Sequence, residues 1–103
     1  MPRFNCYGWW EQLEFGRQLM DDFQISFADG RFDGQGTDIV GPFVISGSLA
    51  GPQIELRKQY IGKHEIIYRG TGDGEGVYSG LWTCNQAIGS GRWLIRFVSI
   101  VDQ

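Results

Sequence analysis

Short segments of alternating apolar and polar residues, separated by turns that contain glycine, recur along the whole chain. In residues 23–27, for example, three apolar residues alternate with Gln24 and Ser26. Successive side chains of a strand point to opposite faces of a sheet, so this period of two predicts half-buried strands. Glycine accounts for 16 of the 103 residues and proline for three. The pattern is typical of an all-β protein.

Eight strands are expected, at residues 4–11, 23–27, 31–37, 43–49, 53–60, 64–69, 77–84 and 92–100. Asp29-Gly30 predicts a type I′ hairpin between the second and third strands. Short turns throughout indicate an eight-stranded antiparallel up-and-down (meander) barrel, avidin-like or lipocalin-like, because closure removes the exposed edges of a sheet. A barrel of this size is filled by side chains or holds one small ligand. Residues 10–22 fit a short helix, a long first strand or an irregular loop.

The length and charge of the chain limit its partners. We expect residues 1–103 to form a single domain. The formal net charge of −3 argues against nucleic acid as a partner. No apolar run approaches the length of a membrane span, and the first residues lack an apolar signal core, so a cytoplasmic protein is expected. Cys6 and Cys84 are expected to be reduced, buried thiols, and no residue spacing suggests a metal or cofactor.

The register of the fifth and sixth strands decides which side chains face the interior. If Tyr60 lies opposite His64, then Glu55 lies opposite Arg69, and this charged pair suits an outer face. The alternative two-residue loop mixes apolar and polar residues on both faces. The first register, which we favour, places seven residues inside: Ile54, Leu56, Lys58, Tyr60, His64, Ile66 and Tyr68.

Four of these inward residues are polar: Lys58, Tyr60, His64 and Tyr68. In one interpretation the tyrosines are core residues, Lys58 extends to the barrel mouth, and His64 is exposed at a turn. In the other interpretation the four side chains orient a ligand in a partly polar cavity. An inward lysine needs an anion or a strong acceptor, because an unpaired buried charge is costly.

Three glycine-x-tryptophan triplets end at Trp10, Trp82 and Trp93. Glycine and tryptophan share a strand face in each triplet, so the glycine leaves room for the ring, and the three indoles are expected inside. They form either an aromatic plug at one barrel end or an aromatic wall for a ligand. With the four polar residues, the candidate ligand-binding set is Lys58, Tyr60, His64, Tyr68, Trp82 and Trp93.

The opposite face of the first and eighth strands is also apolar. Tyr7, Trp9, Leu94, Val98 and Ile100 are expected to point outward. An exposed apolar patch commonly marks an interface, which predicts a two-fold homodimer through these strands.

Two glycine-rich stretches have the appearance of binding loops. Residues 70–76, GTGDGEG, precede a strand rather than a helix, so they do not match a phosphate-binding loop. Asp73 and Glu75 are too few for a calcium loop, and Asp73-Gly74 indicates a hairpin turn. In residues 34–43, the three glycines Gly34, Gly36 and Gly41 are expected at bulges or tight corners, with Asp38 as a turn residue.

Four stretches of the chain together resemble a small β-domain family found alone in bacteria and appended to larger eukaryotic proteins. They are GQGTDIVGPFVISG (34–47), KQYIGKHEIIYRG (58–70), GDGEGVYSGLWT (72–83) and GRWLI (91–95). The resemblance spans residues 31–100. The family has no settled activity, so the resemblance implies the fold and not a function. The strand order and the tryptophan triplets are also similar to avidin-like and lipocalin-like barrels, most of which have a secretory signal that is not evident here.

Three classes of function remain open on these observations. The first is a small-ligand-binding module that uses the inward polar and aromatic side chains. The second is a structural or interaction protein that acts as a homodimer. The third, least favoured, is an enzyme with His64 as base and Tyr60 or Lys58 as acid, which requires His64 within hydrogen-bonding reach of Tyr60 or Tyr68.

Overall fold

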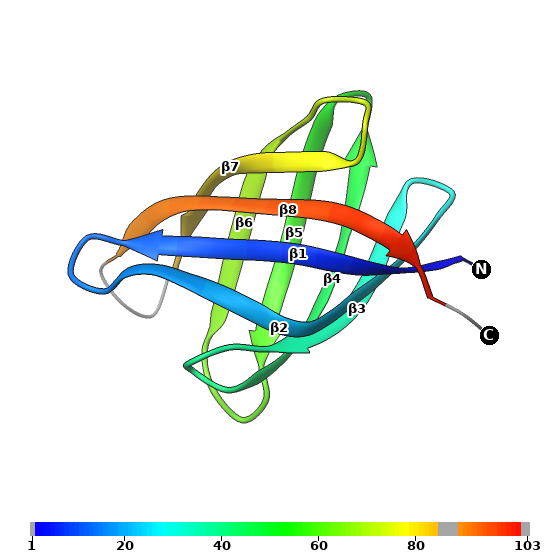
Figure 1. Ribbon diagram of the computed structural model, residues 1–103. Helices are drawn as coiled ribbons and strands as arrows, with labels where there is room; N and C mark the ends of the chain where they lie inside the picture. Colours follow the sequence, from blue (N-terminus) through cyan, green and yellow to red (C-terminus); the bar gives the residue numbers. More distant parts are fainter. Residues whose placement is uncertain (1, 85–88, 102–103) are drawn as a thin grey trace.

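The computed structural model describes residues 2–84 and 89–101, in which eight antiparallel strands close into a barrel in sequence order (Figure 1). The strands are β1 (Arg3–Gln12), β2 (Gly16–Ala28), β3 (Arg31–Thr37), β4 (Pro42–Ala50), β5 (Gln53–Tyr60), β6 (Glu65–Gly72), β7 (Val77–Thr83) and β8 (Ser90–Ile100). β1 pairs with both β2 and β8, which closes the sheet. The predicted all-β up-and-down barrel is confirmed. Within the described ranges no helix is long and apolar enough to cross a membrane.

The barrel interior is filled by the inward side chains of alternating strand positions. In β5, for example, Ile54, Leu56, Lys58 and Tyr60 are buried, whereas Glu55 and Arg57 are exposed. The largest fully buried side chains of the core are Trp93, Tyr68, Phe32, Phe43, Lys58, Ile25, Ile45, Leu56 and Ile95. These nine side chains are four aromatic rings, four aliphatic groups and the charged side chain of Lys58.

The predicted register of β5 and β6 is confirmed. Glu55 pairs with Arg69, and their side chains form a 2.7 Å ion pair on the outer face. At the connecting turn, the backbone N–H of Tyr60 donates to the carbonyl of His64 over 3.2 Å. This register directs Lys58, Tyr60 and Tyr68 into the barrel.

Residues 10–22 form none of the three structures that the sequence left open (a helix, a long first strand or an irregular loop), because most of them belong to the second strand, which was expected only at residues 23–27. β1 continues to Gln12, and the long β2 begins at Gly16. A bulge in β2 shifts the register with β3 between Asp21 and Gln24, and Asp22 has a φ of 48°. The extra residue explains why Met20 and Phe23, three positions apart, are both buried.

Trp10, Trp82 and Trp93 all point inward, as predicted from the glycine-x-tryptophan triplets. The Trp82 indole on β7 reaches past Gly91 of β8 and donates from Nε1 to the carbonyl of Glu11 on β1, over 2.9 Å. A Cβ on Gly91 would collide with that carbonyl and lie 2.8 Å from Trp82 Nε1. The glycine thus makes room for an indole that links non-adjacent strands.

Two of the turns predicted from glycine are present in the structure. Asp29 and Gly30 both have positive φ, as the predicted type I′ hairpin requires. In the turn before β7, Asp73 Oδ1 accepts the backbone N–H groups of Glu75 and Val77, which confirms a structural turn.

The expectation of a bulge in the strand that holds Gly34 and Gly36 is wrong, although Gly36 lies opposite the bulge in β2. Both residues lie in β3, which pairs with β4 without a register shift. A Cβ on Gly36 would lie 2.8 Å from Phe43 Cζ, so this glycine makes room for a core ring. Gly41, with a φ of 143°, does form a tight corner.

The outer face of β1 and β8 is less exposed than the sequence suggested. Trp9 is only 9% exposed, because the Arg17 guanidinium lies over its ring at 3.7 Å from the centroid. Val98 and Ile100 are largely exposed, at 58% and 63%, and Tyr7 is partly exposed. The outer face of β1 and β8 is therefore apolar, but Arg17 covers Trp9, its largest side chain.

Candidate ligand-binding site

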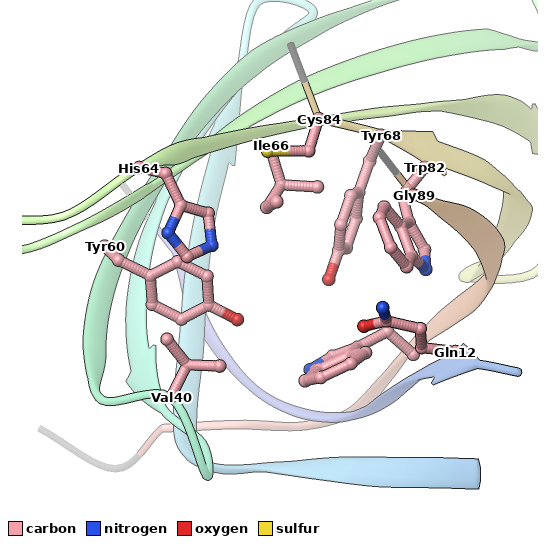
Figure 2. Close-up of a pocket in the computed structure, with 10 residues that line it drawn as sticks. Gln12, Val40, Tyr60, His64, Ile66, Tyr68, Trp82, Cys84 and Gly89 are labelled. Carbon is pink, nitrogen blue, oxygen red and sulfur yellow. The ribbon is translucent and has the colours of Figure 1, made fainter. Parts of the chain in front are cut away.

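A pocket of about 100 Å³ lies at the barrel end where β1, β3, β5 and β7 terminate, and it is partly open to solvent (Figure 2). Its walls are mostly aromatic and apolar, with a few polar groups. The residues that line it are Trp10, Gln12, Val40, Tyr60, His64, Ile66, Tyr68, Trp82, Cys84 and Gly89. The pocket thus draws on strand ends and turns that lie far apart in the sequence.

Four of the six predicted site residues line this pocket: Tyr60, His64, Tyr68 and Trp82. The other two, Lys58 and Trp93, lie deeper in the barrel and support the wall from behind. The Trp93 ring stacks on Tyr68 at 5.0 Å between centroids, with an interplanar angle of 21°. The sequence placed Trp10 and Ile66 inside the barrel but not in the site, and it did not indicate Gln12 or Val40.

Lys58 is completely buried and does not extend to the barrel mouth, so that expectation is wrong. Its Nζ donates to Asp38 Oδ2 at 2.6 Å, to Tyr68 Oη at 3.1 Å and to Met20 Sδ at 3.5 Å. The Phe43 ring centroid lies 4.3 Å from Nζ. An ammonium group has three N–H donors, so this set of acceptors occupies all of them.

Asp38 supplies the anion that the buried lysine needs. Its Oδ2 accepts hydrogen bonds from Lys58 Nζ, from the Tyr60 hydroxyl at 2.7 Å and from Trp10 Nε1 at 3.1 Å. Its Oδ1 accepts the backbone N–H of Val40 at 2.9 Å. The predicted turn role is also confirmed, since the backbones of Asp38 and Gly41 exchange hydrogen bonds.

The ion pair is charged at neutral pH. Burial opposes ionisation of Asp38, but the Lys58 ammonium and the hydrogen bonds from Lys58, Tyr60 and Val40 hold the pKa of Asp38 below 3.8. Burial lowers the pKa of Lys58 to about 8, against the opposing effect of the Asp38 carboxylate. Burial and the contact with Asp38 raise the pKa of Tyr60 far above 10, so its hydroxyl keeps its proton.

The two pocket hydroxyls differ in the hydrogen bond that each can still make. Tyr60 gives its proton to Asp38, so its oxygen remains available as an acceptor. Tyr68 accepts an N–H from Lys58, and no residue within 2–84 and 89–101 accepts its own O–H. Figure 2 shows both hydroxyls pointing into the cavity from different walls. The two tyrosine hydroxyls therefore offer the aromatic pocket one hydrogen-bond donor and one acceptor.

The acid–base pair of His64 with Tyr60 or Tyr68, which the enzyme hypothesis required, is not assembled in the described residues. The His64 and Tyr60 rings are in contact, with centroids 5.2 Å apart, but the Tyr60 hydroxyl donates to Asp38 instead. Among the described residues, the His64 side chain makes no hydrogen bond to Tyr60 or Tyr68. In the same part of the chain, no cluster of three His, Cys, Asp or Glu side chains could hold a metal ion.

Comparison with known proteins identifies the fold only. No family model matches the sequence, and no curated protein matches it. A solved redesigned beta barrel, mFAP1 bound to DFHBI, is similar with a TM-score of 0.61 and 13% identity, over 90% of this chain and 91% of that chain. A second redesigned barrel, mFAP0 bound to DFHBI, has a TM-score of 0.57 and 14% identity, over 88% and 93%. The TM-scores show a shared β-barrel architecture, and at such low identities they show nothing about activity.

Proposed function

We propose that this protein is a small-ligand-binding module, and that the ligand occupies the pocket lined by Tyr60, Tyr68 and Trp82. The observation that carries the proposal is an aromatic cavity at the barrel end in which two hydroxyls keep unused hydrogen-bonding capacity. Binding sites for small molecules combine apolar walls with a few placed polar groups in this way. Two redesigned barrels of the same architecture are bound to DFHBI, which supports the proposal that a barrel of this kind has a ligand-binding site.

The size of the pocket limits the ligand. An apolar cavity of roughly 150 Å³ accommodates benzene, so about 100 Å³ takes part of a ring or a small substituent. Because the pocket is partly open, the rest of the molecule extends beyond the barrel end. We therefore propose a compact, planar molecule that inserts one edge.

The walls are held in place before a ligand arrives. Asp38 fixes the Tyr60 hydroxyl, Lys58 fixes the Tyr68 hydroxyl, and Trp93 stacks behind Tyr68. Side chains already ordered in the free protein lose little conformational freedom on binding, which favours affinity. This is the physical role we propose for the buried ion pair.

The proposal is tested by fluorine NMR titration with 4-fluoroacetophenone. Val40→Phe places a ring in the pocket mouth, and Val44→Phe makes the same change on the outer face of β4. We expect saturable binding to the native protein and to Val44→Phe. In Val40→Phe the new ring fills the cavity, so binding should weaken by at least roughly tenfold. Absence of saturable binding, or equal binding by both variants, would contradict the proposal.

Self-association is the second candidate function. Leu19, Val98 and Ile100, on the outer faces of β2 and β8, each have at least half of their surface exposed. We propose that a second copy covers this face in a two-fold arrangement. Sedimentation velocity at micromolar concentration should then give a dimer that Val98→Lys dissociates, whereas a monomeric native protein would exclude this candidate.

A further inference from the structure

The donors of Lys58 are fully used inside the protein. Nζ has three hydrogens, and Asp38, Tyr68 and Met20 provide three acceptors within 3.5 Å. The side chain has no exposed surface. Lys58 therefore cannot contact a ligand directly, although its charge lies immediately behind the pocket wall.

The Tyr68 hydroxyl is the group through which that charge reaches the pocket. Its oxygen accepts an N–H from Lys58 at 3.1 Å, which directs the phenolic O–H away from the lysine. Burial raises the pKa of Tyr68 well above 10, so the proton stays on the hydroxyl. Figure 2 shows the oxygen facing the cavity, and no acceptor for this O–H exists within residues 2–84 and 89–101.

A hydroxyl in this position favours a ligand that carries a hydrogen-bond acceptor. Tyr68 is 1% exposed, and a buried donor left without a partner is costly. The N–H that Lys58 donates to Oη polarises the O–H bond, because consecutive hydrogen bonds strengthen one another. A ligand atom that accepts this proton therefore satisfies a group that the protein leaves unpaired.

The aromatic walls select the shape of the remaining ligand. Trp10 and Trp82 meet edge to face, with centroids 6.2 Å apart, and the Tyr68 ring is held flat against Trp93. Rigid rings at these positions favour a planar partner, which gains stacking or edge-to-face contacts.

We propose that the ligand is a small aromatic compound with an acceptor oxygen, such as an aryl carbonyl, and that the Tyr68 hydroxyl donates to that oxygen. This inference rests on the proposed function and names the class of molecule bound. Tyr68 is the specificity-determining residue, and Lys58 is a positioning residue that orients the Tyr68 hydroxyl.

The test compares two probes of nearly equal shape by fluorine NMR titration. 4-Fluoroacetophenone has the acceptor oxygen, and in 4-fluoro-α-methylstyrene a methylene group replaces it. Tyr68→Phe should weaken ketone binding by roughly tenfold, as expected for one charge-supported hydrogen bond, and should change styrene binding by less than about twofold. The control Tyr7→Phe, on the outer face of β1, should change neither affinity.

The outcomes separate this inference from the proposed function. If neither probe binds the native protein, the proposed function fails and the inference falls with it. If both probes bind and Tyr68→Phe weakens them equally or not at all, the inference alone is overturned.

A second measurement needs only the native protein, because Tyr68→Phe also removes an acceptor from Lys58 and can unfold the chain. The infrared carbonyl stretch of bound 4-fluoroacetophenone should lie at lower frequency than in an apolar solvent. A stretch at the apolar-solvent frequency shows that no hydrogen bond is made and overturns the inference.

Discussion

Lys58 and Asp38 form an enclosed ion pair, with Lys58 Nζ 2.6 Å from Asp38 Oδ2 and no exposed surface on either side chain. The pair joins β5 to the turn between β3 and β4 at the pocket end of the barrel. Through Tyr60 and Tyr68 it also fixes two pocket hydroxyls. One polar network thus both stabilises the core and positions the hydroxyls of the proposed binding pocket, and such a network is costly to disrupt in part.

Removing the anion of this pair should destabilise the fold strongly. Asp38→Asn leaves the Lys58 amine buried without its counter-ion, and we expect a loss of about 3 kcal/mol in the free energy of unfolding, measured by urea denaturation. Glu55→Gln removes a similarly short ion pair on the exposed outer face and should cost less than about 1 kcal/mol. Equal losses for the two variants would contradict this account.

Replacing both members of the pair should restore part of that stability. Lys58→Met combined with Asp38→Asn removes the buried charge altogether, so the double variant should be more stable than Asp38→Asn alone. The comparison uses the same urea denaturation. A double variant with the summed losses of the two single variants would show that the residues act independently.

The fold should lose stability at alkaline pH. Burial raises the folded-state pKa values of Tyr60, Tyr68 and Tyr78 above 10, whereas an unfolded tyrosine ionises near pH 10. The lowered pKa of Lys58, about 8 instead of 10.5, has the opposite effect, but that effect is complete by about pH 10.5. Above that pH the unfolded chain has released tyrosine protons that the folded chain retains, so stability is progressively lost. Urea midpoints and tyrosinate absorption against pH measure this effect. Ionisation of these tyrosines near pH 10 in a chain that stays folded would contradict it.

The two cysteines should report pocket occupancy by their alkylation rates. Cys84 lines the pocket, whereas burial raises the pKa of the Cys6 thiol to about 12. Iodoacetamide should therefore modify Cys84 before Cys6, as followed by peptide mass spectrometry. With 4-fluoroacetophenone at about ten times its Kd, the Cys84 rate should fall by roughly tenfold. An unchanged Cys84 rate at saturation would place the probe elsewhere.

A methyl group at Gly91 should disturb the seam where the barrel closes. The added Cβ collides with the Glu11 carbonyl and crowds the Trp82 indole, so Gly91→Ala should cost about 2 kcal/mol in unfolding free energy. Gly74→Ala, in an open turn with a φ of 81°, has only a backbone cost of about 1 kcal/mol. Thermal or urea denaturation compares the two, and a smaller effect at Gly91 than at Gly74 would contradict the packing account.

Strand periodicity was sufficient to predict the barrel and much of the pocket wall. Alternation in β5 and β6 set one register, and that register placed Lys58, Tyr60 and Tyr68 inside. The glycine-x-tryptophan triplets also predicted the three inward indoles, although the steric reason was wrong, because Gly91 makes room for Trp82 rather than for the tryptophan of its own triplet. These predictions succeeded because a one-residue change of register reverses every side chain, which leaves few consistent solutions.

Strand periodicity did not predict two features of the structure, the second role of Asp38 and the bulge in β2. Asp38 is in a turn, where the period of two assigns no direction, and the only signal for its second role was the need of a buried lysine for an anion. The bulge at Asp22 interrupts alternation in β2, so Met20 and Phe23 did not predict a continuous strand there. Both features depend on contacts between distant segments.

The most direct test of the account is to locate 4-fluoroacetophenone on the native protein by intermolecular nuclear Overhauser effects. If the barrel end binds the probe, its methyl protons should give effects to the aromatic protons of Trp82 and Tyr68. Effects only to outer-face side chains such as Leu81 or Val98, or no effects at saturation, would contradict the central claim that this pocket is a small-molecule site.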